Sequence, residues 1–246
     1  MLDACVAGDI FAAPGGEKVF EALDYVKRDA GTLLITLNHN GDRMSGSKAM
    51  RKAQKAGLKV VEIVIHDDIA QGPDTPIEDK RGLGGVIPFI KVVGAAAEAG
   101  KSLDEIVALA NAFNDGIATL SVALKTATHP QNGGEIGSLA DDEMEIGMGQ
   151  HGEGGGGISK MCTADETVEK MLPPLVKATK LAAGDKALLL INGSGATTTM
   201  EMLICYRKAK QMLADADTAG KLAIDAACAK AEEELKELSR QVSEKA

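Results

Sequence analysis

The chain has 246 residues, of which 45% are hydrophobic, and its 27 basic and 36 acidic residues give a formal net charge of −9. This length fits one large domain or two small ones, and the apolar content excludes a mainly disordered chain. The acidic balance argues against nucleic acid or an anionic membrane as the main partner. No apolar run reaches the roughly 18 residues of a membrane span, and no secretory leader is visible, so we expect a cytoplasmic protein. Four cysteines without a CxxC pair predict thiols that bind no zinc.

The first part of the chain predicts an α/β arrangement. A helix is expected over residues 17–27, and the near-continuous apolar run at residues 32–37 is typical of a strand buried on both faces. A polar loop at residues 38–42, a helix over residues 47–56 and a second strand over residues 58–65 follow. Strand, helix and strand in this order predict a parallel pair.

The rest of the chain continues with helices and shorter strands. Ser102 and Glu105 have the spacing of a capping box, which predicts a helix from there to about residue 114. Further helices are expected at three places: residues 82–99, residues 163–180 and the segment that ends near residue 212. Further strands are expected at three apolar runs: residues 119–124, 144–146 and 187–191.

These elements suggest three parts. We expect a first α/β domain over residues 1–118, a second α/β domain over residues 119–216, and a tail over residues 217–246. Ala, Lys and Glu dominate the tail, which favours a helix. The predicted fold class is therefore α/β, with each domain a β-sheet flanked by helices.

His151 is the most specific candidate for chemistry. Glycines flank it on a segment that leaves a short strand, so small neighbours keep the imidazole accessible. A neutral imidazole is a nucleophile and can also act as a general acid or base. The alternative is a surface histidine without a function.

Carboxylates follow both strands of the predicted pair. Asp42 closes the loop after the first strand, and the carboxyl ends of strands are where open α/β sheets bind ligands. Asp42 can take a proton from a hydroxyl, or it is simply a turn residue. Asp67 and Asp68 follow the second strand, but adjacent side chains point in different directions, which argues against one shared metal ion.

The other histidines and one glycine-rich loop give weaker signals. His39, His66 and His129 have no metal-ligand spacing, so structural or solvent-facing roles and no metal site are expected. The loop at residues 193–195 follows an apolar run and precedes a helix. It could hold a phosphate, but it matches neither the Walker A nor the dinucleotide motif and is equally well a tight connection.

Six strings, in order and spacing, resemble the substrate-binding (K) subunits of the dihydroxyacetone (glycerone) kinase family, known as DhaK. They are residues 1–11, Gly41-Asp42, Arg81-Gly82, residues 94–98, residues 142–153 and residues 191–197. The resemblance runs from residue 1 to about residue 216, and the segment around His151 is its most specific part.

The resemblance implies a two-domain α/β fold, a homodimer and an unusual capture of substrate. By motif, His151 adds to the ketone carbonyl and forms a covalent hemiaminal, which selects short ketones such as dihydroxyacetone over polyols. Asp42 matches the acidic residue that contacts the hydroxyl to be phosphorylated and accepts its proton. The resemblance implies that a separate L subunit carries ADP or ATP with Mg²⁺, and that this chain itself binds no cofactor or metal.

Two substrate-contact positions and both ends depart from the family pattern. Ala13 stands where the family has a serine and Leu37 where it has a lysine, so the loss of hydrogen-bond donors predicts another short ketose or slower catalysis. The family's segment ending in Gly-His-Glu-Pro does not precede Met1, and residues beyond 216 do not match. We therefore expect an N-terminally truncated member with a divergent tail.

Two functions follow from this sequence. The first is a phosphotransferase subunit that presents a ketose for phosphorylation through His151 and Asp42. The second is a non-catalytic paralogue that binds a ketone on His151 and acts as a sensor or coactivator. A truncated chain that folds poorly and does neither is the third possibility.

Overall fold

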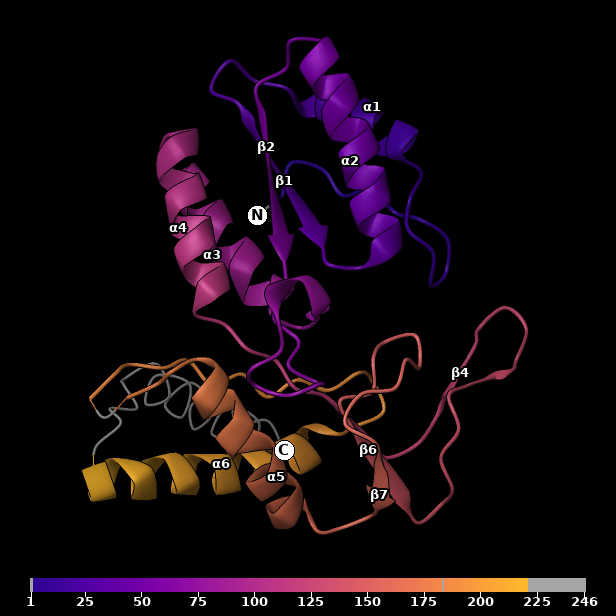
Figure 1. Ribbon diagram of the computed structural model, residues 1–246, viewed down its shortest axis with the longest axis vertical. Helices are drawn as coiled ribbons and strands as arrows, with labels where there is room; N and C mark the ends of the chain where they lie inside the picture. The colour runs from indigo at the N-terminus through magenta and orange to yellow at the C-terminus, as the bar shows by residue number, and fades with distance from the viewer. Residues whose placement is uncertain (1, 183, 221–246) are drawn as a thin grey trace, which may run out of the picture. The chain divides into compact units, whose positions relative to one another are not determined.

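The computed structural model describes residues 2–182 and 184–220 (Figure 1). By its internal contacts the chain divides into two compact units, unit 1 (Met1–Met161) and unit 2 (Cys162–Ala246). The domain boundary expected near residue 118 stays a prediction. Of the expected helical tail, residues 221–246 lie outside the described residues.

A parallel strand pair forms the centre of unit 1. Strand β1 (Thr32–Leu37) pairs with β2 (Val60–Ile65), with Thr32 opposite Val60 and Leu37 opposite Ile65. Helix α2 (Asn40–Lys55) connects the two strands. This confirms the predicted parallel pair and the mixed class of helices and sheets.

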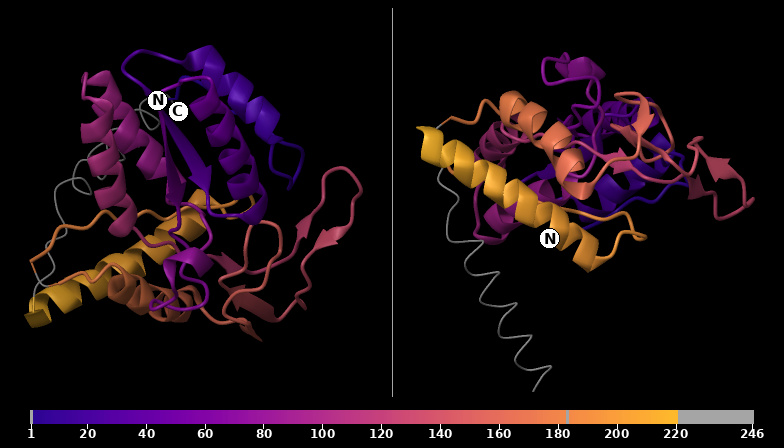
Figure 2. Two further views of the ribbon diagram at one scale, coloured as in Figure 1. Left: turned by 45° about the horizontal axis from the view of Figure 1, so that its top comes forward. Right: turned by 90° about the horizontal axis from the view of Figure 1, so that it is seen from below.

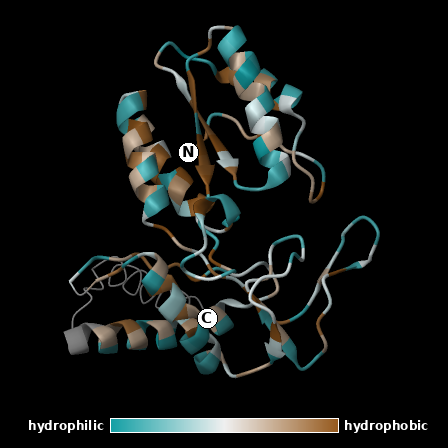
Figure 3. Ribbon diagram, in the orientation of Figure 1, coloured by the Kyte–Doolittle hydropathy of each residue, from teal (hydrophilic) through white to brown (hydrophobic). Residues whose placement is uncertain are grey.

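Helices cover both faces of this pair, which explains why its strands are apolar throughout (Figures 1 and 2). Side chains alternate along a strand, so β1 serves two cores. Its odd-numbered side chains pack with β2, α3 (Val86–Glu98) and α4 (Leu103–Asp115) around the fully buried Phe89. On the other face, Leu34 packs against α1 (Gly16–Val26) and α2. Apolar colours accordingly concentrate on the strands and the inner helix faces (Figure 3).

Helix α2 begins at Asn40, seven residues before the predicted start at residue 47. His39 is its extended N-cap and Asp42 lies in its first turn, where a carboxylate interacts favourably with the helix dipole. Gly46, which suggests a loop, instead lies inside the helix and close to the carboxylate end of the Glu62 side chain. A Cβ at this glycine would lie 2.2 Å from Glu62 Oε1 of β2. The capping box at Ser102 and Glu105 is confirmed at the start of α4.

The rest of unit 1 is built from short strands. An antiparallel sheet has the order β3 (Val122–Ala123), β6 (Glu143–Ile146), β7 (Ile158–Lys160), and β4 (Ala127–Thr128) pairs with β5 (Glu135–Ile136). A 3-10 turn, η1 (Ile77–Asp79), lies between β2 and α3. His151 belongs to the loop between β6 and β7.

Unit 2 contains two packed helices in its described part. Helix α5 (Ala164–Ala178) and helix α6 (Thr199–Gly220) share a small core of four buried side chains: Val168, Leu172, Ala209 and Leu213. None of the helices in the described part of the chain is long and apolar enough to cross a membrane.

Two predicted strands are wrong in extent or in kind. The strand expected at residues 119–124 is reduced to β3, although Thr119 forms a bridge with Asp68. Residues 187–191 form no strand, and Leu188 and Leu190 are exposed. An apolar run becomes a strand only when a neighbouring strand completes the hydrogen-bond ladder, and unit 2 has no such strand among its described residues.

Candidate functional site

His39 lies in the short connection between the end of β1 and the start of α2. The chain leaves β1 at Leu37, and His39 caps α2 with extended backbone angles. Its Nε2 lies 2.9 Å from the carbonyl oxygen of Gly82. A carbonyl only accepts, so Nε2 carries the proton and donates, which leaves the lone pair of the neutral ring on Nδ1.

Gly82 makes this contact possible because it lies against the backbone of both strands. A Cβ at this position would lie 2.6 Å from the carbonyl oxygen of Ile65 and 2.9 Å from the backbone nitrogen of Asn38. Only glycine fits so close an approach, which gives a physical reason for the Arg81-Gly82 string.

His151 is oriented by a residue two positions further along. Its Nδ1 lies 2.6 Å from Glu153 Oε1, and its backbone N–H donates to Glu153 Oε2 over 2.9 Å. A carboxylate accepts, so the proton is on Nδ1 and the lone pair of the neutral ring is on Nε2. The turn closes where Gly149 N–H donates to the carbonyl of Glu153 over 2.7 Å. At Gly152 φ is +80°, a conformation that favours glycine.

The Glu153 carboxyl group stays ionised because of these bonds. Partial burial raises its pKa, but the hydrogen bonds from the His151 ring and from backbone N–H groups outweigh this effect. The net result is a pKa below the ordinary value of 4.5. Glu153 is therefore a carboxylate at neutral pH, ready to stabilise positive charge on the imidazole.

Two rings from distant parts of unit 1 meet the ring of His151. The centroid of the His39 ring lies 5.4 Å from that of His151, with planes at 75°. The Phe11 ring centroid lies 5.3 Å from that of His151, and the His129 ring centroid lies 5.5 Å from that of Phe11. These edge-on contacts assemble a cluster of two imidazoles and one carboxylate beside an apolar ring. Sequence analysis missed His39, Phe11 and Glu153 as members of this cluster.

An ion pair holds the His151 loop against the strand pair. Arg81 Nε donates to Asp68 Oδ2 over 2.8 Å, and another guanidinium nitrogen donates to the carbonyl of Gly147 over 2.7 Å. Asp68 is almost fully buried. Burial raises its pKa, although the positive charge of Arg81 opposes this effect. Neighbouring Asp67 points elsewhere and accepts the N–H groups of residues 83 and 85, so the two carboxylates do not share an ion.

The remaining predicted residues lie near the start of α2. Asp42 is half-buried in the first turn, three residues after His39. Ala13 is half-buried, and its Cβ lies 3.0 Å from where a Cβ of Gly41 would be. Leu37 ends β1 and packs into the core beside α3 and α4. A role of Ala13, Leu37 and Asp42 in binding substrate stays a prediction.

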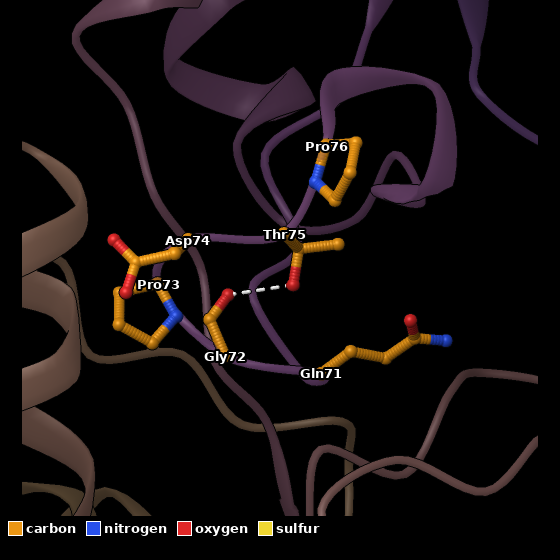
Figure 4. A pocket seen from close by; sticks show the side chains of 6 residues that line it. All are labelled: Gln71, Gly72, Pro73, Asp74, Thr75 and Pro76. Atoms are coloured by element: carbon orange, nitrogen blue, oxygen red, sulfur yellow. Dashed lines mark hydrogen bonds between the residues drawn. The ribbon is translucent and has the colours of Figure 1, made fainter.

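A separate surface hollow lies in the loop before η1. Residues 71–76 line it, and the Thr75 hydroxyl donates to the carbonyl of Gly72 over 2.8 Å (Figure 4). None of the predicted site residues lines this hollow, so it is distinct from the cluster around His151.

Comparison with known proteins gives one consistent result. The Dak1 domain model matches residues 1–235. The dihydroxyacetone-binding subunit DhaK of a PTS-dependent dihydroxyacetone kinase from Listeria innocua is 38% identical over 216 residues, which cover 88% of this chain and 66% of that protein. The chain thus spans just under two thirds of the length of this relative.

Solved structures agree with the sequence match. A dihydroxyacetone kinase operon co-activator, DhaQ, superposes with a TM-score of 0.79 at 29% identity, over 87% of this chain and 66% of its own. The dihydroxyacetone kinase of C. freundii superposes with a TM-score of 0.73 at 30% identity, over 83% of this chain and 37% of its own.

Proposed function

Because this chain belongs to the Dak1 domain family, we propose that it is the substrate-binding subunit of a dihydroxyacetone kinase. It holds dihydroxyacetone or a related short ketose as a covalent hemiaminal on His151. The observation that carries this proposal is the 2.6 Å bond between His151 Nδ1 and Glu153 Oε1, because this bond leaves the nucleophilic lone pair on Nε2.

Capture of the ketone by His151 is balanced in atoms and charge when the imidazole gives up one proton. The Nε2 lone pair attacks the carbonyl carbon, a C–N bond forms, and the π electrons of the carbonyl pass to its oxygen. The ring becomes positively charged and gives its Nδ1 proton to the Glu153 carboxylate. The alkoxide oxygen takes up one proton from solvent, and Glu153 releases the proton from Nδ1 to solvent. The adduct is therefore neutral. A polyol has no carbonyl carbon to attack and is therefore not captured.

Phosphorylation needs a second group on this chain and a partner. In our proposal Asp42 orients the terminal hydroxyl of the captured ketose and accepts its proton as the phosphoryl group arrives. An L subunit supplies that group from a nucleotide held with Mg²⁺. We infer that the chain works as a homodimer in the cytoplasm, without nucleic acid or membrane as a partner.

Intact-protein mass spectrometry tests the capture step. The protein is incubated with dihydroxyacetone, desalted rapidly and weighed beside the His151→Ala and His129→Ala variants. We expect an adduct with the mass of one ketone in the wild type and in the His129→Ala control, which keeps the neighbouring imidazole. Loss of the adduct only in His151→Ala supports capture, whereas an adduct that persists in this variant refutes it.

The similarity to the co-activator structure favours a second candidate function, a ketone-binding regulator without phosphoryl transfer. Both functions include capture on His151, so the adduct does not separate them. A phosphoryl-transfer assay with an L subunit does. The kinase subunit turns over ketose, and Asp42→Asn abolishes turnover while leaving the adduct. A regulator forms the adduct without any turnover.

A further inference from the structure

Three potential metal ligands meet in the cluster around His151. One donor atom each from His39, His151 and Glu153 lies within 4.8 Å of the others. The two histidines come from different elements, the N-cap of α2 and the loop after β6, so the spacing along the chain does not reveal the set. We propose that these three side chains bind one divalent transition-metal ion, such as Zn²⁺, in the place of the proton between His151 Nδ1 and Glu153 Oε1.

The hydrogen bonds of His39 support this assignment. Metal-bound histidines almost always donate their other ring N–H to a carbonyl or a carboxylate, which fixes the ring. His39 already donates Nε2–H to the carbonyl of Gly82 over 2.9 Å. Its Nδ1 lone pair is therefore available, and its ring is held in place before an ion arrives.

His151 and Glu153 supply the other two ligands. Nδ1 and Oε1 lie 2.6 Å apart, whereas the donor atoms of a tetrahedral Zn²⁺ site with bonds near 2.0–2.1 Å lie about 3.3 Å apart. Binding of one ion requires these side chains to rotate, so that Nδ1 and Oε1 separate and the gap to the His39 donor atom, at most 4.8 Å, closes. Their side chains are 35% and 38% exposed, so they have room to rotate and a hydrated ion can reach them.

The ligand types select the ion. Two imidazole nitrogens and one carboxylate suit Zn²⁺, Co²⁺, Ni²⁺ or Cu²⁺, whereas Mg²⁺ and Ca²⁺ prefer oxygen ligands alone. Three protein ligands leave one position of a tetrahedral site for water.

Occupation of this site prevents ketone capture, a consequence that rests on the proposed function. The ion takes the Nδ1 lone pair, and the proton displaced from Nδ1 moves through solvent to Nε2, so that the imidazole remains neutral. Nε2 then has no lone pair with which to attack a carbonyl carbon. Metal and ketone are therefore mutually exclusive on His151.

Titration of the whole 246-residue chain, free of metal, with ZnCl₂ tests the site by isothermal calorimetry. We expect one Zn²⁺ per chain. His39→Ala is expected to weaken binding more than about 100-fold, the upper end of the effect of losing an outer partner of a ligand. His39→Gln keeps a donor for the Gly82 carbonyl but offers no ring nitrogen, so it separates loss of the ligand from loss of the fold. His129→Ala, which also removes an imidazole near Phe11, is the matched control and should bind as the wild type does.

The absorption spectrum with Co²⁺ and the competition between Zn²⁺ and dihydroxyacetone complete the test. Co²⁺ should give the visible absorption of a tetrahedral nitrogen and oxygen site. Thiolate-to-cobalt bands, or Zn²⁺ binding that is unchanged in both His39 variants, would overturn the proposal. One equivalent of Zn²⁺ should abolish the dihydroxyacetone adduct, and an undiminished adduct would overturn the competition. Zn²⁺ binding without any adduct in the metal-free protein would refute the proposed function but not the metal site.

Discussion

Replacing Arg81 with leucine tests whether a buried ion pair holds the loop that carries His151. Three hydrogen bonds are lost: the one from Arg81 Nε to Asp68 over 2.8 Å, and those from the two terminal nitrogens to the carbonyls of Gly147 over 2.7 Å and Glu153 over 3.4 Å. The Asp68 side chain is only 1% exposed, so it stays buried without its cation. Breaking such a pair from one side costs about 3–5 kcal/mol, and we expect the free energy of unfolding to fall by this amount at pH 7.

The loss of unfolding free energy in Arg81→Leu should become smaller as the pH falls. Burial already raises the pKa of Asp68 above 3.8, and the charge of Arg81 restrains this effect, so the pKa rises further in the variant. A carboxyl group with a raised pKa in the folded state favours folding when it is protonated. The stability of the variant therefore increases as pH falls toward the folded-state pKa. The difference in unfolding free energy between the variant and the wild type should therefore narrow as the pH is lowered from 7.

Urea unfolding followed by far-ultraviolet circular dichroism measures both effects. Lys101→Leu is the matched control, because its ion pair with Glu105 spans 3.0 Å but both partners are more than half exposed. Such a solvent-exposed pair contributes little to stability. Arg81→Lys keeps the positive charge but loses the planar guanidinium, so its loss of unfolding free energy should lie between those of Arg81→Leu and Lys101→Leu. A loss in Arg81→Leu no larger than in the control, or a difference that does not change with pH, would refute the reasoning.

Three further substitutions have expected outcomes. Glu153→Gln keeps an oxygen that accepts the hydrogen bond from the imidazole but loses the carboxylate that takes up the proton. Formation of the dihydroxyacetone adduct, measured by mass spectrometry, should therefore slow by roughly 100-fold. Phe89→Ala empties the centre of a core in which this side chain is fully buried, and should lower the unfolding free energy in urea by about 3–5 kcal/mol. Gly82→Ala brings a Cβ within 2.6 Å of the Ile65 carbonyl oxygen and should cost about 1–3 kcal/mol by the same assay. Its control, Gly84→Ala, meets a methyl group only at 3.5 Å and should change little.

Local patterns predicted the centre of the fold well. The apolar run at residues 32–37 and the capping box at Ser102 depend on neighbours in sequence, and both are confirmed. The apolar run at residues 187–191 failed because a strand depends on a partner elsewhere in the chain. The start of α2 was placed too late because the glycines in its first two turns suggest a loop, whereas Gly46 packs against Glu62.

The candidate site was predicted in part. His151 stood out because glycines surround it, and Glu153 was within reach of the same reasoning, since it lies two residues further along. His39 and Phe11 could not be found in this way, because only the folding of unit 1 brings their rings within 5.4 Å of His151. Spacing along a chain reveals ligands on one element, not ligands that tertiary packing assembles.

The closeness of His151 and Glu153 along the chain has a consequence for how the site tolerates change. The tautomer of the imidazole is set within one five-residue turn, from Gly149 to Glu153, whereas the place of that turn depends on Arg81. The tautomer of His151 and the position of His151 in unit 1 therefore depend on different residues. If His151 is the nucleophile that we propose, divergence elsewhere in unit 1 can move the turn toward a differently shaped substrate without changing the bond that sets its tautomer.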